Sequence, residues 1–324
     1  MEFVNLGRSG LKVSRLCLGT MVFGSQCDER ESFAILDCAD ELGFNFIDTA
    51  DAYPVPPDLK SAGRTEEIIG SWLRGRRERF VLATKFTNAM GPGPNDVGGS
   101  RKHVIEACEA SLRRLGTDRV DLYYIHRYDD SAPVDETMDA LDHLVRDGKV
   151  LYVGISNYAA WQLALAYAHV RERGLAPVVA IQPRLNLLAR QPERDLLPLC
   201  RAAGIGVMPY NPLGAGMLTG KYRRSAEAPE GSRFSWGEYG TMYRGRYWSD
   251  RMFDLVEILV EVARAEGVSA AQAAIAWTLT REAVTAPVIG ASRPDQLRET
   301  AASVDVHLSN DAVARLEEAS SLFA

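Results

Sequence analysis

The chain has 324 residues, of which 46% are hydrophobic and 25% are charged, and its formal net charge is −6. This is the composition of an ordinary globular protein. The acidic balance without a Lys/Arg block gives no indication of a nucleic-acid partner. No apolar run approaches the ~20 residues of a membrane span, and the N-terminus lacks a signal-peptide core, so a cytoplasmic protein is expected. Five scattered cysteines without a C-x-x-C pair indicate reduced thiols, and no metal is expected.

The first predicted elements are extended segments. Residues 3–14 have a central Gly-Arg-Ser-Gly turn and predict an N-terminal hairpin. After the hairpin, short apolar and β-branched runs recur, and several are apolar at consecutive positions, as is typical of strands buried on both faces. The predicted strands are residues 15–20, 44–50, 80–86, 121–126, 150–156, 178–183, 204–210 and 287–292.

Amphipathic segments lie between these runs, and several of them stop at a glycine. The predicted helices are residues 31–43, 100–116, 134–147, 159–173, 191–203 and 252–266. Strands that alternate with helices in this way predict an α/β fold, a (β/α)8 TIM barrel, with an open doubly wound sheet as the alternative.

A barrel of this type needs ~250 residues, so the chain has residues to spare. The excess is assigned to the hairpin, a Gly/Pro-rich loop at 87–99, a long polar-aromatic loop at 222–250 after the seventh strand, and a C-terminal helix at 309–322. Neither a linker nor an internal repeat is recognisable. A single barrel domain of residues 1–324 is therefore predicted.

Polar side chains stand at the ends of several predicted strands, where the functional residues of such barrels gather. Asp48 and Tyr53 follow the second strand, Lys85 lies on the third and His126 ends the fourth. Each has an ordinary alternative, such as a capping aspartate, a packed tyrosine or a lysine that extends to solvent. Because all four converge on one mouth of the barrel, a catalytic site is the favoured interpretation.

These four residues form a coherent set for donating a proton. A phenol with a pKa near ~10 is a weak acid at neutral pH. A nearby ammonium lowers that pKa, and a carboxylate keeps the ammonium charged and in place. An imidazole can orient the substrate oxygen through a hydrogen bond. The set therefore predicts the reduction of a carbonyl by a hydride donor.

The motifs DTADAY, ATKF, DLYYIH, GISN, PYNPLGAGMLTGKY and PVIGASRPDQL, in this order, resemble those of the aldo-keto reductase superfamily over essentially the whole chain. The resemblance implies an NADPH-dependent carbonyl reductase with Tyr53 as the general acid. The implied catalytic tetrad is Asp48, Tyr53, Lys85 and His126.

The resemblance also implies how the cofactor is bound. Ser156, Asn157 and Gln182 hold the nicotinamide carboxamide, and Tyr210 stacks on the ring. The other implied contacts are Gly19, Thr20, Met21, Asp48, Asn211, Pro212, Leu213, Gly214, Gly216, Ile289 and Gly290.

Phosphate-binding features occur in two places. GAGMLTGK at 214–221 is a near miss to both the dinucleotide fingerprint and the P-loop. On a barrel it is interpreted as a small-residue loop that approaches a pyrophosphate, with Lys221 adding charge. Ser292 and Arg293 begin a helix after the eighth strand, where the helix dipole favours an anion. They suit the 2′-phosphate of NADPH, although an ordinary N-cap with a surface arginine is the alternative.

The resemblance adds two residues on the same helix. Gln296 is implied to contact the 2′-phosphate and Glu299 to contact the adenine. Thr300 stands where relatives often carry asparagine, so that adenine contact is in doubt.

The predicted substrate contacts are Tyr53, His126, Arg127 and Trp236. Aromatic and arginine residues within 222–250 suit a substrate with a planar ring and anionic groups, such as a nucleotide sugar, while a lid that packs on itself is the alternative. YPVPP followed by GRTEEIIGSWL resembles both broad-specificity bacterial aldehyde and ketone reductases and the actinobacterial keto-deoxysugar reductases. A nucleotide-linked 4-keto-6-deoxyhexose is the leading specific hypothesis for the small-molecule carbonyl substrate. A cofactor-sensing subunit resembling potassium-channel β subunits is the alternative of a different class. The sequence indicates no oligomeric state.

Overall fold

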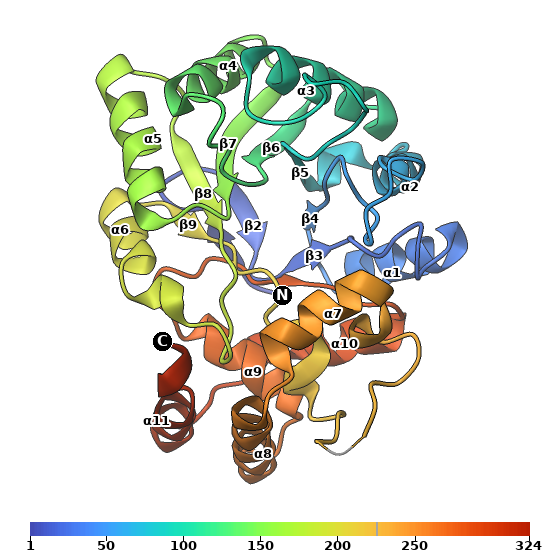
Figure 1. The fold of residues 1–324 in the computed structure, drawn as a ribbon, viewed down its shortest axis with the longest axis vertical. Coiled ribbons are helices and arrows are strands. Elements are labelled where there is room, and N and C mark those ends of the chain that lie inside the picture. The colour runs from blue at the N-terminus through green and yellow to red at the C-terminus, as the bar shows by residue number, and fades with distance from the viewer. Residues whose placement is uncertain (225) are drawn as a thin grey trace.

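In the computed structural model, which describes residues 1–224 and 226–324, the chain forms a (β/α)8 barrel (Figure 1). Eight parallel strands pair in the order β10-β3-β4-β5-β6-β7-β8-β9. Backbone bonds between the two outer strands close the sheet, since Thr285 N donates to Val207 O and Val288 N donates to Pro209 O, each at 2.8 Å. The predicted barrel is therefore confirmed, and the open sheet is wrong.

Each barrel strand overlaps a run that the sequence predicts. The strands are β3 Cys17–Gly19, β4 Phe46–Asp48, β5 Val81–Phe86, β6 Val120–Ile125, β7 Val150–Ser156, β8 Val178–Gln182, β9 Gly206–Val207 and β10 Val288–Ile289. β1 Phe3–Asn5 and β2 Lys12–Ser14 pair antiparallel, which confirms the N-terminal hairpin. All residues of β4, β5 and β6 are buried, as strands covered on both faces must be.

Most of the helices also lie where the sequence predicts them. They are α1 Glu29–Glu41, α3 Arg101–Leu115, α4 Val134–Arg146, α5 Ala160–Arg173, α6 Leu196–Ala203, α8 Asp250–Ala265, α10 Pro294–Ala301 and α11 Asn310–Ala319. Within the described residues, no helix combines the length and the apolar character that crossing a bilayer requires.

Two further helices were not predicted, α2 Arg64–Leu73 and α9 Ala270–Leu279. α2 begins after Gly63, which has a positive φ and offers no capping side chain. α9 is apolar around most of its circumference, so it lacks the amphipathic stripe that marks a surface helix. The position of α9 thus follows from packing in the folded barrel, whereas α2 carries an apolar face that the sequence analysis did not use, formed by Ile68, Ile69, Trp72 and Leu73.

The prediction of a long loop at 222–250 is wrong for half of that segment. It contains a short 3-10 turn, Arg233–Ser235, and the helix α7, Gly237–Tyr247, which crosses the lower part of the face shown in Figure 1. Three glycines and two arginines leave little contrast between an apolar and a polar face in the sequence, although its three tyrosines share one side of the helix. Tertiary contacts stabilise the helix instead: Tyr243 and Tyr247 are buried, and Arg244 Nε donates to Phe234 O at 2.8 Å.

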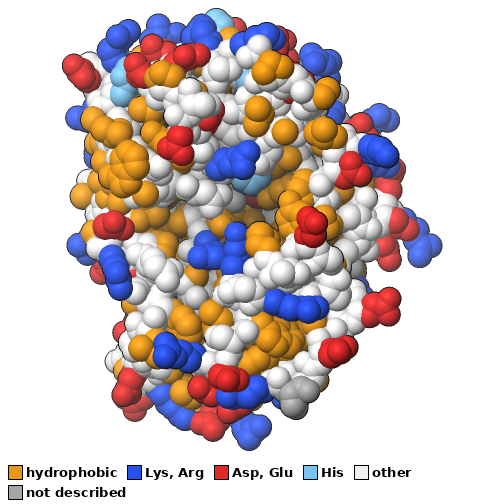
Figure 2. Space-filling view, viewed as in Figure 1, with side chains coloured by type: hydrophobic (Ala, Val, Ile, Leu, Met, Phe, Trp, Pro, Cys, Tyr) orange, Lys and Arg blue, Asp and Glu red, His pale blue; other side chains and the backbone are white. Residues whose placement is uncertain are grey.

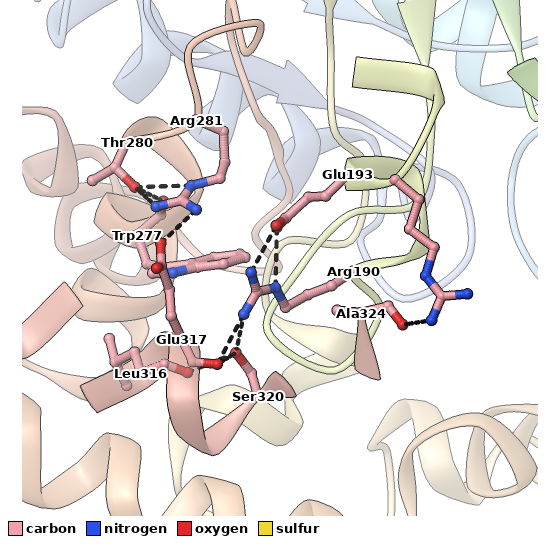
Figure 3. Close-up of polar contacts among 10 residues, drawn as sticks. Arg190, Glu193, Trp277, Thr280, Arg281, Leu316, Glu317, Ser320 and Ala324 are labelled. Carbon is pink, nitrogen blue, oxygen red and sulfur yellow. Dashed lines mark hydrogen bonds and ion pairs between the residues drawn. The ribbon is translucent and has the colours of Figure 1, made fainter. Parts of the chain in front are cut away.

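A cluster of cationic and aromatic groups ties the C-terminal helix to the barrel. Figure 3 shows the indole of Trp277 on α9 between two guanidinium groups, with Arg190 at 5.2 Å and Arg281 at 4.9 Å from the ring. Arg190 donates to Ser320 Oγ at 2.8 Å, and Arg281 pairs with Glu317 at 2.6 Å. The predicted C-terminal helix is thus confirmed as α11, and these contacts hold it in place.

Candidate active site

The carboxyl ends of the barrel strands open into a cavity of about 880 Å³. Figure 2 shows its mouth as a hollow near the centre of this face, with Lys and Arg side chains beside it. Every residue that the sequence analysis proposed as a cofactor contact lines this cavity except Gly214, which is buried. Eight strand ends thus bring residues from position 19 to position 299 together.

Lys85 lies behind the cavity wall and is fully buried. Its Nζ donates to Asp48 Oδ2 at 2.5 Å and to Thr49 O at 2.8 Å, while Gln182 Nε2 donates to Asp48 Oδ1 at 2.8 Å. Burial alone would lower the pKa of Lys85, but the charges of Asp48 and Tyr53 and the bond to Asp48 raise it above its ordinary value. The lysine is therefore a charged ammonium next to the cavity.

Tyr53 lies between the lysine and the histidine. Lys85 Nζ is 5.2 Å from the centroid of the Tyr53 ring, and the rings of Tyr53 and His126 meet edge-on, with centroids 5.9 Å apart. Burial raises the pKa of Tyr53 above its ordinary value, and this outweighs the lowering that Lys85 causes. The expected direction of the lysine effect is right, but the expected net lowering is wrong because desolvation is larger. The phenol is therefore protonated at neutral pH.

His126 is neutral at physiological pH. Burial, together with the charges of Lys85 and Arg127, holds the pKa of His126 well below its ordinary value. Asn88 Nδ2 lies 2.8 Å from His126 Nδ1, so the amide donates to Nδ1. A neutral imidazole that accepts at Nδ1 carries its proton on Nε2. The ring therefore offers one N–H donor.

The sequence analysis missed Asn88, which lines the cavity beside His126. The sequence feature that could have identified Asn88 is its position three residues after Lys85, just beyond the end of β5. Since parallel strands end at the same mouth, this loop faces the end of β6, from which His126 comes.

Asn157 connects the polar groups at the ends of β7 and β8. It has a positive φ of 56°, and its side-chain amide donates to His126 O at 2.9 Å. Its Oδ1 accepts from the Tyr210 hydroxyl at 2.8 Å, and Ser156 Oγ donates to Gln182 O at 2.8 Å. The hydroxyl and amide groups of these residues therefore surround a part of the cavity that suits a flat polar group.

Three cationic side chains gather at the other end of the cavity, Lys221, Arg233 and Arg293. Burial lowers the pKa of Lys221, and the charges of the two arginines lower it further. Arg293 precedes α10 and pairs with Asp295 through two contacts of 3.1 Å. Such a cluster can bind phosphate groups. Arg233 comes from the segment that the sequence analysis assigned to the substrate.

Thr300 lines the cavity near Glu299, at the adenine position that the resemblance implies. Its hydroxyl donates to Gln296 O at 2.9 Å, within its own helix. The Thr300 hydroxyl therefore donates within its own helix rather than into the cavity.

The structure places only two of the four predicted substrate contacts in the cavity lining. Tyr53 and His126 line the cavity, whereas Arg127 is exposed beside it. Trp236 is outside the lining and packs edge-on against Tyr243, with ring centroids 6.4 Å apart.

The helix α7 adds cavity residues that the sequence analysis named only as members of a loop. Tyr239, Tyr243 and Arg246 all line the cavity. Their spacing of four and three residues places them on one face of a helix. This part of the cavity wall is therefore a helix face rather than an irregular loop.

A closed parallel barrel with a buried ammonium, a phenol and an imidazole at its mouth defines the class of barrel oxidoreductases. The chain belongs to the Aldo/keto reductase family, whose sequence profile matches residues 15–321. The family predicted from the motifs is thus confirmed.

Relatives cover nearly the whole chain. The uncharacterized oxidoreductase YrpG of Bacillus subtilis (strain 168) is 38% identical over 98% of this chain and 95% of its own length. A probable voltage-gated potassium channel subunit beta of Arabidopsis thaliana is 40% identical over 94% of this chain and 92% of its own length. The L-glyceraldehyde 3-phosphate reductase of Escherichia coli O157:H7 is 35% identical over 98% of this chain and 92% of its own length. The resemblance to an actinobacterial subgroup stays a prediction.

Proposed function

We propose that this protein is an NADPH-dependent reductase that converts an aldehyde or ketone to an alcohol, with Tyr53 as the general acid. The observation that carries the proposal is that the Tyr53 phenol in the cavity lies between the buried Lys85 ammonium, 5.2 Å from its ring, and the His126 imidazole, 5.9 Å from it. NADPH oxidation with a panel of aldehydes, 1,2-diketones and a dTDP-4-keto-6-deoxyhexose tests it directly.

The cavity fits a nicotinamide dinucleotide. Amide and hydroxyl groups of Ser156, Asn157 and Gln182 stand at the tetrad end, and the Tyr210 ring lies beside them. Three cations stand at the other end, where the cofactor phosphates would lie. When bound, the cofactor supplies a hydride to the carbonyl carbon.

The protein's own residues supply the proton and the orientation. The carbonyl oxygen accepts hydrogen bonds from the Tyr53 hydroxyl and from His126 Nε2–H. As negative charge develops on this oxygen, Tyr53 donates its proton and becomes a phenolate, which the Lys85 ammonium stabilises. Asp48 holds that ammonium in place. A proton from solvent restores the phenol after the alcohol leaves.

The specific substrate that we propose first is a nucleotide-linked keto-deoxyhexose, with a broad-specificity aldehyde or diketone reductase as the alternative. Aromatic and cationic groups of α7 on the cavity wall support an anionic, ring-containing substrate. All five cysteines are free and buried, which fits the cytoplasmic location that we propose.

A cofactor-sensing subunit is the second candidate, because one relative is named as a probable potassium channel β subunit. The substrate panel separates the two. Turnover of any carbonyl supports the enzyme, whereas tight NADPH binding with no turnover of any compound favours the sensing role.

Replacing Arg293 should change the choice of cofactor. In Arg293→Ala, the Kd for NADPH is expected to rise roughly 10-fold, while the Kd for NADH changes little, because only NADPH carries the 2′-phosphate that a guanidinium binds. Quenching of intrinsic fluorescence measures both constants. Arg298→Ala is the matched control, since Arg298 is exposed on the same helix and pairs with Glu41. An equal loss for the two cofactors refutes the 2′-phosphate role.

Replacing Asn88 should change the protonation of His126. In Asn88→Asp, the carboxylate accepts from Nδ1–H and favours the imidazolium, so the pKa of His126 should rise. The profile of kcat/KM against pH should gain a group that titrates in the accessible range. Asn95→Asp adds the same charge to an exposed position of the same loop and should leave the profile unchanged. A profile in Asn88→Asp identical to that of the wild type contradicts the role of Asn88.

A further inference from the structure

We propose that Arg127, Arg184 and Arg246 form an anion subsite at the tetrad end of the cavity, which selects carbonyl substrates that carry a phosphoryl group. The proposal rests on the carbonyl reduction proposed above and names its substrate class. The shared chemistry is a phosphate ester or diphosphate at a distance from the reacting carbonyl, as in a sugar phosphate or a nucleotide-linked sugar.

The three arginines come from three different elements around the mouth of the barrel, and Arg246 lines the cavity whereas Arg127 and Arg184 lie outside its lining. Arg127 follows His126 directly at the end of β6, and Arg184 lies two residues beyond the end of β8. The backbone of Arg184 bridges to that of Tyr210, a cavity residue. Arg246 lines the cavity from α7. Each guanidinium therefore starts from an element that ends at the mouth or covers it.

The charges of all three act on groups that line the cavity. Arg127 lowers the pKa of His126 and also acts on Tyr239. Burial raises the pKa of Tyr210 to about 12, and the charges of Arg184 and Arg246 oppose this rise. Each of the three guanidinium groups therefore lies close enough to the cavity lining to act on it. Figure 2 shows Lys and Arg side chains on two sides of the hollow.

None of the three side chains forms an ion pair with any residue in the ranges 1–224 and 226–324. Asp129 lies two residues after Arg127. Burial would raise the pKa of Asp129, but its hydrogen bonds with Ser131 and Gly99 and the charge of Arg127 lower it. The carboxylate accepts from Gly99 N at 2.7 Å and from Ser131 N at 2.9 Å rather than pairing with Arg127. Within those ranges, the three guanidinium groups therefore lack a direct carboxylate partner.

The cofactor phosphates do not account for these three arginines. The cations that act on Lys221, at the phosphate end, are Arg233 and Arg293. The cations that act on Tyr210, at the tetrad end, are Arg184 and Arg246. The two sets of arginines therefore act on different residues of the cavity lining. Guanidinium groups bind phosphate in a planar, two-point geometry, so the second set fits a phosphoryl group on the substrate.

A kinetic experiment tests the selection. The ratio of kcat/KM for DL-glyceraldehyde 3-phosphate to that for DL-glyceraldehyde is expected to exceed roughly 10 and to fall as ionic strength rises. Arg127→Ala, Arg184→Ala and Arg246→Ala should each lower this ratio roughly 10-fold. Arg171→Ala, an exposed arginine on α5, is the matched control and should not change it. A wild-type ratio near 1, or variants that lose both activities equally, would overturn the proposal.

A dTDP-4-keto-6-deoxyhexose in the same assay identifies the source of the phosphoryl group. A loss with this substrate in the three variants, but not in the control, assigns the subsite to nucleotide sugars. A loss with the triose phosphate alone assigns it to sugar phosphates.

A binding experiment keeps the test independent of turnover. With the protein saturated by NADP⁺, so that the cofactor phosphate site is filled, calorimetry should detect glycerol 3-phosphate but not glycerol. The affinity should fall roughly 10-fold in each arginine variant. If no carbonyl is reduced but glycerol 3-phosphate still binds, the proposed reaction fails and the subsite stands. If glycerol 3-phosphate does not bind, or binds equally to all variants, the subsite is wrong.

Discussion

Tyr53→Phe is expected to abolish carbonyl reduction while leaving NADPH binding nearly unchanged. The substitution removes only the hydroxyl that donates the proton, and a positioned general acid contributes ~10²–10⁴-fold to the rate. The ring remains, so its edge-on packing with His126 and its place beside Lys85 are preserved. The measurements are kcat for NADPH oxidation with an aldehyde and the Kd of NADPH from fluorescence quenching.

Tyr243→Phe is the matched control, because Tyr243 lines the same cavity from α7 but has no part in the proposed proton transfer. Its effect on kcat should be far smaller than that of Tyr53→Phe. If Tyr53→Phe keeps near wild-type activity, Tyr53 is not the acid and the proton comes from another group.

The wild-type rate should also show the protonation state of this group. The acid must be protonated to act, so activity is present below the pKa of Tyr53 and falls as pH rises through it. Because burial raises that pKa above the ordinary value of 10.0, the alkaline limb should lie above pH ~10. Tyr53→Phe should lose this limb from any residual activity.

The four tetrad residues could be predicted from the sequence because local signals placed them. Apolar runs marked the strands, and a polar residue at the end of such a run can only lie at the mouth of a parallel barrel. Lys85, for example, is the next-to-last residue of ATKF and of β5, and the structure pairs it with Asp48 at 2.5 Å.

Other parts of the site depend on contacts between distant segments, which no local pattern encodes. The three glycines of α7 weaken its helical signal, and its Tyr243 and Tyr247 are buried in a cluster of core residues that includes Phe253 and Trp277. The role of Asn88 rests on one contact with a ring that lies 38 residues further along the chain. The net direction of the Tyr53 pKa shift depends on how deeply the ring is buried, which only the fold decides.

The second large effect is expected from breaking the buried ion pair between Lys85 and Asp48. The side chains of Lys85 and Asp48 are 0% and 4% exposed. Lys85→Met removes the ammonium but leaves the Asp48 carboxylate buried with only the Gln182 amide as a donor. Breaking such a pair from one side destabilises a protein by ~3–5 kcal/mol, so the free energy of unfolding should fall by about that amount. Carbonyl reduction should be lost as well, since nothing stabilises the phenolate.

The pair's stabilising effect should also depend on pH. The pKa of Lys85 is raised in the folded protein above the ordinary value of 10.5. A raised pKa of this kind contributes stability that is fully present below the unfolded value and is lost as pH rises through the folded value. Unfolding measured from neutral pH to above pH ~10.5 should therefore show a loss in the wild type that Lys85→Met lacks.

A second substitution separates loss of the pair from loss of packing. Adding Asp48→Asn to Lys85→Met replaces the unpaired carboxylate with a neutral amide, so the double variant should recover part of the lost stability while remaining inactive. Urea denaturation with matched m-values measures both changes. If the double variant is no more stable than Lys85→Met, the cost came from filling the lysine cavity rather than from the stranded charge. In that case the buried charge of Asp48 contributes little to the loss of stability, and the expected destabilisation by an unpaired carboxylate is wrong.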